Sequence, residues 1–304
     1  MRSMELITNK QYNEFRQSHF EIRVENTKVL LPEKWQIKSF TPPADYQTET
    51  TTVWSFPDRG DWATHTGKYR GNWSPYIPRN LILRYTEKGD TILDQMVGSG
   101  TTLVECKLLE RNAIGVDINP NAIMITRNRL NFDYGLSDLE YQEPKINTYV
   151  GDARNLNLIE SNSVDLIATH PPYANIIPYS HELIEGDLSK VHAISDFAEE
   201  VKDVAQESFR VLKPGKICAI LIGDSRKHKH YIPISIRVLQ SFLDAGFILK
   251  EDIIKLQWKT SSSYGSWRGK NYDFYLIAHE HLYVFRKPDA GERLTKFKDS
   301  MAWW

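Results

Sequence analysis

The chain has 304 residues, of which 41% are hydrophobic and 25% are charged, and its formal net charge is −1. This composition predicts a soluble globular protein with a sizeable core, and the near-zero charge excludes a global positive field for nucleic acid. No apolar run reaches the ~20 residues that span a bilayer, and two cysteines, Cys106 and Cys218, exclude a disulfide framework, so we expect a cytoplasmic protein.

Residues 1–88 show no helical or strand period and combine aromatic residues with cations. We expect them to form an irregular extension that packs on the rest of the chain and does not fold independently. One stretch of this extension holds Trp54, Arg59, Trp62, His65, Lys68, Tyr69, Arg70 and Trp73.

Residues 89–304 alternate short β-rich runs with helical patterns, which is typical of a sheet covered by helices on both faces. The sequence therefore predicts an α/β domain with a doubly wound, mostly parallel sheet of about seven strands, one of them antiparallel near the C-terminus. The predicted strands are Thr91–Asp94, Ala113–Asp117, Asn147–Val150, Val164–Thr169, Ile217–Ile222, Phe247–Lys255 and His281–Arg286. The predicted helices are Thr101–Glu110, Pro120–Leu130, Asp196–Leu212 and Pro233–Ala245.

The run Leu93-Asp94-Gln95-Met96-Val97-Gly98-Ser99-Gly100-Thr101-Thr102 predicts a buried strand that turns on two glycines into a helix. Glycines let the backbone approach a ligand closely, and ligands of open α/β sheets bind beyond the carboxyl ends of the strands. A phosphate-binding P-loop is excluded because no lysine follows the turn. A dinucleotide fingerprint is excluded because Leu103 stands where its third glycine is needed. A tight turn without a ligand remains the alternative.

Carboxylates end the two strands that follow this turn. Asp117 ends the second predicted strand, where a carboxylate can accept hydrogen bonds from ribose hydroxyls. Asp152 ends the third, where it can bond an adenine amino group. Each residue alone could be a helix N-cap. Their positions after successive strands favour a nucleoside site.

A second motif, Thr169-His170-Pro171-Pro172-Tyr173, follows the fourth predicted strand. It places a polar side chain, two prolines and an aromatic ring where a planar group can be stacked and hydrogen-bonded. A single histidine at a strand end is more often structural. The Pro-Pro-Tyr that follows it, and the distance from the glycine turn, favour a functional site instead.

Together the two motifs resemble the cofactor loop and the catalytic motif of the amino-methyltransferases of DNA, which transfer a methyl group from S-adenosylmethionine to an exocyclic base nitrogen. The resemblance implies a Rossmann-like methyltransferase fold with S-adenosylmethionine as cofactor. The family's cofactor positions correspond to Asp94, Met96, Gly98, Ser99, Gly100, Thr101, Thr102, Asp117, Ile118, Asp152 and Ala153. A weaker match, Asn72-Trp73-Ser74-Pro75-Tyr76-Ile77-Pro78, resembles the family segment at the methionine end of the cofactor, with Trp73, Ser74 and Pro75 as its cofactor positions. Gln95 departs from the family, where proline is common, and predicts altered loop rigidity.

By the same resemblance, His170 and the carbonyl of Pro171 accept the hydrogens of the target amine, while Tyr173 stacks on the extruded base. These hydrogen bonds free the nitrogen lone pair, which is otherwise conjugated with the ring. Pro172 completes the motif, and Thr169 is an alternative acceptor. The family usually has Asp, Asn or Ser in place of His170, but a neutral imidazole still offers one acceptor nitrogen.

Other chemistry is not expected. Methylation at cytosine C5 needs a cysteine nucleophile, yet Cys106 is predicted on a helix and Cys218 inside a strand. No metal-ligand spacing stands out. The histidine pairs in His228-Lys229-His230 and His279-Glu280-His281 are interpreted as surface or nucleic-acid contacts.

We expect the substrate to be double-stranded DNA with a short specific target, methylated at cytosine N4. Adenine N6, the amine of an RNA base, and nucleic-acid binding without catalysis are the alternatives. Candidate DNA contacts are the aromatic and cationic stretch of the extension and the ranges 176–190, 226–230 and 259–270, with Arg59, Arg70 or Arg268 reading guanine edges. By analogy with modification enzymes, we expect a cognate restriction endonuclease as partner, and a prokaryotic, nucleoid-associated location. A monomer is compatible with the sequence.

Overall fold

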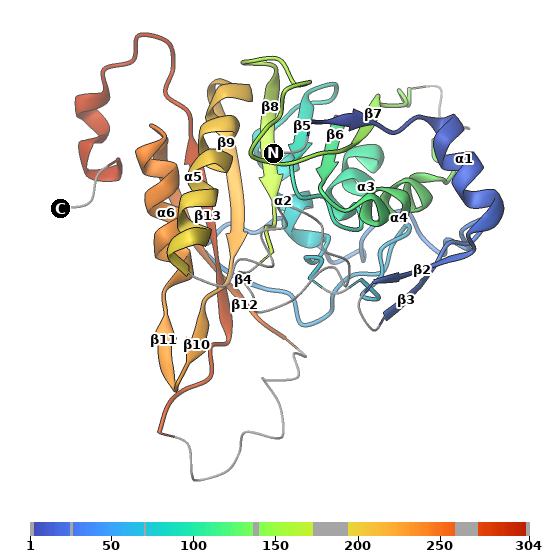
Figure 1. Cartoon of the computed structure of the whole chain (residues 1–304), viewed down its shortest axis with the longest axis horizontal. Coiled ribbons are helices and arrows are strands. Elements are labelled where there is room, and N and C mark those ends of the chain that lie inside the picture. The colour runs from blue at the N-terminus through green and yellow to red at the C-terminus, as the bar shows by residue number, and fades with distance from the viewer. Residues whose placement is uncertain are drawn as a thin grey trace.

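The computed structural model describes residues 3–24, 27–69, 71–135, 140–172, 194–258 and 273–301. Its centre is a nine-stranded sheet with the order β1-β7-β6-β5-β8-β9-β13-β12-β4 (Figure 1). Five neighbouring strands are parallel: β7 (Ile146–Val150), β6 (Asn112–Asp117), β5 (Thr91–Asp94), β8 (Val164–Thr169) and β9 (Leu212–Ile222).

The two strands predicted near the C-terminus lie in the same sheet. β13 (His279–Arg286) is antiparallel to both of its neighbours, β9 and β12 (Ile248–Leu256). The seven predicted strands, the mostly parallel sheet and the antiparallel strand are therefore confirmed.

The N-terminal segment is more regular than the sequence predicted, and it widens the sheet from seven strands to nine. β1 (Glu5–Leu6) pairs with β7 at one edge, and β4 (Val53–Ser55) pairs with β12 at the other. Between them lie α1 (Asn9–Ser18) and the pair β2 (Glu21–Val24) and β3 (Thr27–Leu30). Strands this short take their conformation from the edge that they join, so they leave no hydrophobic period in the sequence.

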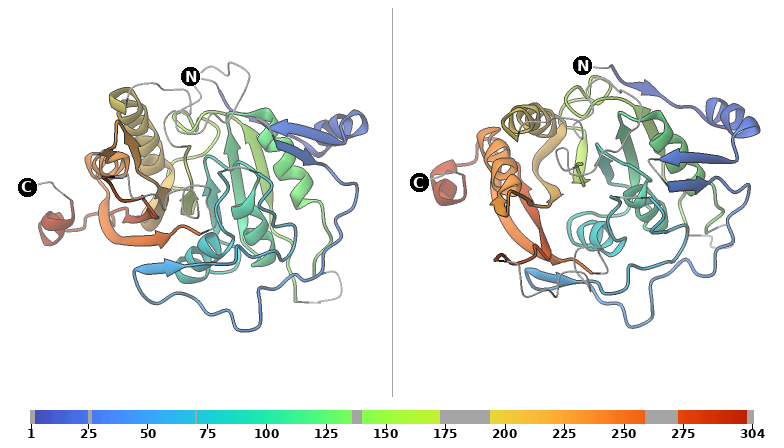
Figure 2. Two further views of the ribbon diagram at one scale, coloured as in Figure 1. Left: turned by 90° about the horizontal axis from the view of Figure 1, so that it is seen from below. Right: turned by 60° about the horizontal axis from the view of Figure 1, so that its bottom comes forward.

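Figure 2 shows the connection from β3 to β4 running around the outside of the molecule. It is tied to the main body at several points. The Trp35 indole donates to the carbonyl of Asn128 at 2.8 Å, and the Phe40 ring lies against Phe132.

Helices cover both faces of the sheet, as the doubly wound prediction requires. α2 (Tyr76–Tyr85), α3 (Thr101–Leu108) and α4 (Pro120–Leu130) pack on one face, and α5 (Ile194–Val211) and α6 (Ile234–Asp244) on the other. Strand β8 shows the division: Leu166 and Ala168 join the core beneath α2 to α4, whereas Ile167 joins the core beneath α5 and α6.

Two smaller elements complete the described chain: the hairpin of β10 (Ser225–Lys227) with β11 (His230–Ile232), and a 3₁₀ helix over Leu294–Ser300. Within the described ranges, no helix combines the length and the apolarity needed to cross a bilayer. Residues 176–190 and 259–270, with Arg70, Tyr173 and Arg268, lie outside the described residues.

Candidate functional site

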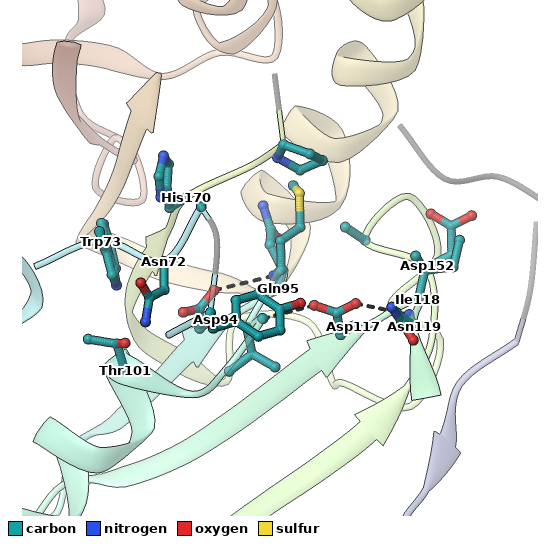
Figure 3. Close-up of a pocket in the computed structure, with 17 residues that line it drawn as sticks. Asn72, Trp73, Asp94, Gln95, Thr101, Asp117, Ile118, Asn119, Asp152 and His170 are labelled. Atoms are coloured by element: carbon teal, nitrogen blue, oxygen red, sulfur yellow. Dashed lines mark hydrogen bonds between the residues drawn. The ribbon is translucent and has the colours of Figure 1, made fainter. Parts of the chain in front are cut away.

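A cavity opens at the carboxyl ends of β5, β6, β7 and β8, and Figure 3 shows the side chains that line it. The strand ends supply most of this lining, and the segment that leads into α2 supplies the rest. The lining residues are Tyr69, Gly71, Asn72, Trp73, Asp94, Gln95, Met96, Val97, Gly98, Thr101, Asp117, Ile118, Asn119, Asp152, Ala153, His170 and Pro172.

The glycine turn between β5 and α3 brings backbone to the cavity. Gly98 and Gly100 have φ angles of 52° and 81°, in the left-handed region that side chains disfavour. A Cβ on Gly100 would also lie 2.7 Å from Cγ2 of Thr126, so this position tolerates no side chain without rearrangement. Thr126 in turn donates its hydroxyl to the carbonyl of Gly98 at 2.9 Å.

Asp94, the last residue of β5, joins the glycine turn to strand β8. One carboxylate oxygen accepts the hydroxyl of Thr102 at 2.5 Å, and the other accepts the hydroxyl of Thr169 at 3.0 Å. Burial raises the pKa of Asp94 to about 7, even though these hydrogen bonds lower it. The carboxyl group of Asp94 is therefore partly protonated near neutral pH.

The carboxylates that end β6 and β7 are both held by hydrogen bonds. Asp117 accepts the backbone N–H of Gly98 at 2.8 Å and that of Asn119 at 2.9 Å. Asp152 accepts the Nε of Arg154 at 2.9 Å and a terminal guanidinium nitrogen at 2.5 Å. The far side of this guanidinium pairs with Glu200 on α5. Both carboxylates are thus fixed in orientation.

His170 follows β8 and lies on the opposite side of the cavity from Asp117 (Figure 3). Its ring stacks on Trp73, with centroids 5.9 Å apart and planes 20° apart. Burial lowers the pKa of His170 to about 4, and the nearby Glu280 and Lys255 act on the ring with opposite signs. The imidazole is therefore neutral at physiological pH and keeps one nitrogen as an acceptor.

Gln95 anchors the turn in a way that proline could not. Its side-chain amide donates to the hydroxyl of Ser208 on α5 at 2.9 Å, and the residue is fully buried. The altered loop chemistry expected from the sequence thus takes the form of a side-chain tie to a helix on the far face of the sheet.

Most of the residues predicted for the cofactor line the cavity, together with two from the second motif. The remaining predicted residues are not among those that line it: Ser74, Pro75, Ser99, Gly100, Thr102, Thr169 and Pro171. Tyr173 lies outside the described residues. The lining also contains Tyr69, Gly71, Val97 and Asn119, which the sequence did not assign to the cofactor, and Asn72, the first residue of the weaker match. Local sequence carries no signal for Tyr69, because it reaches the cavity by long-range packing.

In the aromatic and cationic stretch of the extension, the prediction of a DNA-contacting surface is wrong for the aromatic members, whereas Lys68 is exposed and Arg70 lies outside the described residues. The aromatic side chains of the stretch are buried, and Arg59 donates to the side chain of Asn72 and the carbonyl of Trp73. The buried members are Trp54, Trp62, His65, Tyr69 and Trp73. Large aromatic rings bury more apolar area than any other side chains, and here they fill the core beside α2 and α3.

The two histidine pairs differ in their surroundings. His228 and His230 are exposed at the tip of the β10–β11 hairpin, as interpreted from the sequence. Glu280, in contrast, is buried and pairs with Lys255 at 2.7 Å, while His281 pairs with Asp252 at 3.0 Å. His279 and His281, the residues interpreted as surface contacts, are thus half-buried on either side of the buried Glu280, which forms the ion pair.

The two cysteines lie where the sequence put them, Cys106 on α3 and Cys218 in β9, and both are buried free thiols. Burial raises the pKa of each thiol, so neither is a ready nucleophile. In the described part of the chain, no group of three or more metal-binding side chains is placed to hold an ion.

Comparison with known proteins identifies a family and several partial relatives. The model of a family described as DNA methylase matches residues 4–128 and 164–302, and one described as an RMKL-like methyltransferase domain matches residues 81–186. The chain is 37% identical over 106 residues to a tRNA (guanine(10)-N2)-dimethyltransferase of Methanothermobacter thermautotrophicus, covering 34% of this chain and 29% of that protein.

It is also 44% identical over 69 residues to the type II methyltransferase M2.DpnII of Streptococcus pneumoniae, covering 23% of this chain and 25% of that protein. The matched region thus spans less than a third of either relative. Among solved structures, a SAM-dependent methyltransferase of Methanosarcina mazei superposes with a TM-score of 0.47 and 15% identity, over 69% of this chain and 98% of that one.

Proposed function

The chain belongs to the DNA methylase family of S-adenosylmethionine-dependent enzymes, and from this membership we propose that it methylates the exocyclic amino group of a base in double-stranded DNA. The observation that carries this proposal is a single cavity with two kinds of lining. Gly98 and the carboxylates of Asp117 and Asp152 line one side, and His170 with Pro172 lines the other. A methyl donor and a target amine can therefore meet in one place.

The residues on the first side fit S-adenosylmethionine, which supplies the methyl group. The open backbone at Gly98 receives the cofactor, Asp117 accepts hydrogen bonds from the ribose hydroxyls, and Asp152 accepts one from the adenine amine. Oδ1 of Asp152 already accepts two hydrogen bonds from Arg154, whereas Oδ2 accepts one and keeps acceptor capacity for the adenine amine. Ile118 and Ala153 give apolar contact to the adenine ring, and Trp73 lies toward the methionine end.

On the second side, His170 accepts a hydrogen of the target amine. Its low pKa supports this role, because a protonated imidazole would have no acceptor nitrogen. The carbonyl of Pro171 accepts the second hydrogen, and Tyr173 stacks on the extruded base. With both hydrogens held, the amine nitrogen would become pyramidal and its lone pair available to the methyl carbon. Transfer would break the sulfur–methyl bond, release S-adenosylhomocysteine and leave one amine proton to be lost to solvent.

The favoured target is cytosine N4, because the motif begins with Thr169-His170 and not with the Asp that favours adenine N6. This preference rests on the sequence of the motif alone. The hydroxyl of Thr169 donates its hydrogen to Asp94, so it gives no further support for either base. Adenine N6 is the alternative within the same chemistry. A type II relative favours a role in restriction–modification, with a cognate endonuclease as partner and a cytoplasmic location near DNA.

An RNA substrate is a second candidate. The tRNA (guanine(10)-N2)-dimethyltransferase of Methanothermobacter thermautotrophicus matches this chain over 106 residues, which is a longer stretch than that of M2.DpnII. Amine methylation of RNA and of DNA uses the same two motifs, so the cavity fits both substrates.

Incubation with labelled S-adenosylmethionine and either duplex DNA or RNA separates these functions. We expect label on DNA, and N4-methylcytosine in mass spectra of the digested nucleosides. Detection of N6-methyladenine would show that adenine, not cytosine, is the target base. Label on RNA alone would show that the substrate is RNA, not DNA. Absence of label on both, with the cofactor bound, would leave a nucleic-acid-binding protein without catalysis.

A further inference from the structure

A chain of buried polar side chains lies behind the glycine turn and takes no part in the cavity lining. It runs from Arg79 on α2 through Glu105 on α3 and His65 to Arg129 on α4. The last three are almost fully buried, with 0%, 6% and 2% of their surface exposed. Three ionisable groups in the interior need an explanation, because desolvation cancels much of the attraction between buried charges.

Arg129 ends this chain directly on the turn. One terminal nitrogen donates to the carbonyl of Ser99 at 2.7 Å and to its hydroxyl at 2.8 Å. The Nε donates to the carbonyl of Thr64 at 3.1 Å, and the other terminal nitrogen contacts Nδ1 of His65 at 3.1 Å. The planar guanidinium thus binds Ser99, the middle residue of the Gly98-Ser99-Gly100 turn, through its carbonyl and its hydroxyl.

The contact with Arg129 fixes the tautomer of His65. A guanidinium can only donate, so Nδ1 of His65 accepts and the ring proton sits on Nε2. Nε2 then donates to Glu105 Oε1 at 2.7 Å. Burial lowers the pKa of His65 to about 4, so the ring keeps this neutral form at physiological pH.

Glu105 accepts three hydrogen bonds in this network. Its Oε1 also accepts the indole N–H of Trp62 at 2.7 Å, and its Oε2 accepts Arg79 at 2.8 Å. Burial alone raises the pKa of Glu105, but His65 and Arg79 lower it below the ordinary value, so the carboxylate stays ionised. His65 and Arg129 are therefore each oriented by a residue from a distant part of the chain.

A residue of the cavity lining also makes a hydrogen bond with the turn. Asn72, which lines the cavity, donates to the hydroxyl of Ser99 at 3.1 Å and accepts from Arg59. Ser99 is thus held between Asn72 and Arg129 while the adjacent glycine backbone faces the cavity. Such a network adds little stability in proportion to its cost, but it fixes geometry.

We propose that Arg129, oriented by His65 and Glu105, is a positioning residue for S-adenosylmethionine, holding the Ser99 peptide so that the Gly98–Gly100 backbone is shaped for the cofactor before it binds. Preorganisation of this kind appears as affinity, because the ordering cost is not incurred at binding. The inference rests on the cofactor assigned under the proposed function. It goes beyond that function by assigning cofactor affinity to groups that never touch the cofactor.

The test is calorimetric binding of S-adenosylmethionine to Arg129→Lys. Lysine keeps the charge but cannot hold Ser99, Thr64 and His65 together, so we expect affinity to fall about tenfold or more. At saturating cofactor the rate of methyl transfer should stay within a few-fold of wild type, which gives a rise in KM with little change in kcat.

The matched control is Arg111→Lys. Arg111 is also buried, with 7% exposed, but it donates to Thr86 and to the carbonyl of Leu109, away from the cavity. We expect it to lower the free energy of unfolding without changing cofactor affinity. If both variants lost the same cofactor affinity, general destabilisation would explain the loss, and the inference would be overturned.

A second pair of variants tests the orienting step. The amide of His65→Gln can still accept from Arg129 and donate to Glu105, whereas His65→Leu can do neither. We expect Gln to retain most of the cofactor affinity and Leu to lose it. Wild-type affinity in both Arg129→Lys and His65→Leu would overturn the positioning role alone. Wild-type protein that binds no S-adenosylmethionine would overturn the proposed function as well.

Discussion

The two sides of the cavity are built differently. On the proposed cofactor side, the carboxylates of Asp94, Asp117 and Asp152 are each fixed by two or more hydrogen bonds. On the proposed transfer side, the ring of His170 is buried, stacks on Trp73 and makes a hydrogen bond with the backbone of Gly71 (Figure 3). The cofactor side is thus held by carboxylates that accept several hydrogen bonds each, and the transfer side by a buried, stacked ring that bonds to backbone.

This difference implies that binding and transfer can be separated by mutation. A carboxylate removed from the cofactor side releases loop amides and should change affinity. A side chain removed from the transfer side leaves the loop intact and should change the rate. The expected effects below run from the largest to the smallest, and each tests that separation.

His170→Ala should abolish most methyl transfer and leave cofactor binding unchanged. The alanine has no acceptor for the amine hydrogens, and we expect the transfer rate to fall by about 100-fold or more. Single-turnover transfer and calorimetry measure the two quantities. His170→Asn is the matched control, because its side-chain carbonyl restores an acceptor and should recover part of the rate. Full activity of His170→Ala would move the acceptor role to Thr169 and the backbone.

The pKa of Asp94 makes stability depend on pH. Its pKa is raised to about 7 in the folded chain from an ordinary value of 3.8, so the folded state binds the proton more tightly. Its contribution is complete below pH 4 and is lost as the pH rises through 7, at roughly 1 kcal/mol per pH unit in between. Urea unfolding at pH 5 and 7 should show this loss in wild type and not in Asp94→Asn. An identical slope in both proteins would assign the dependence to other groups.

Asp117→Ala should weaken binding of S-adenosylmethionine by about 2 kcal/mol, through lost charge-assisted hydrogen bonds. The variant also frees the N–H of Gly98, so affinity and loop order should fall together. Asp165→Ala is the control: it removes a buried carboxylate that pairs with Lys213 near the start of β8, and it should cost stability only. Unchanged affinity in Asp117→Ala would remove this residue from the site.

The sheet could be predicted from the sequence because each central strand has a recognisable local sequence pattern. Each of the seven strands is a β-rich run bounded by turn residues, and a parallel order then brings their carboxyl ends together. That is why Asp94, Asp117 and Asp152 could be expected at one edge before any coordinates. Strands β1 and β4 were missed because each has only two or three residues, and pairing with a distant edge determines them.

The extension was misjudged for a related reason. A stretch rich in tryptophan, histidine and arginine has the same composition whether it binds nucleic acid or fills a core. The partners that decide the outcome are far along the chain: Trp62 and His65 meet Glu105, and Arg129 reaches back to Thr64. Composition cannot reveal contacts across 40 to 65 residues of sequence.

The smallest expected effect tests the stacking contact itself. Trp73→Phe keeps an aromatic face but reduces its overlap with His170, and aromatic pairs contribute about 0.5–1.5 kcal/mol beyond burial. We expect transfer to slow by less than tenfold. If Trp73 acts by orienting His170, Trp73→Phe should cause no further loss in the His170→Ala background, because the two changes then remove one interaction. Additive losses in this cycle would show instead that Trp73 acts on the cofactor independently, and cofactor affinity would then fall in Trp73→Phe alone.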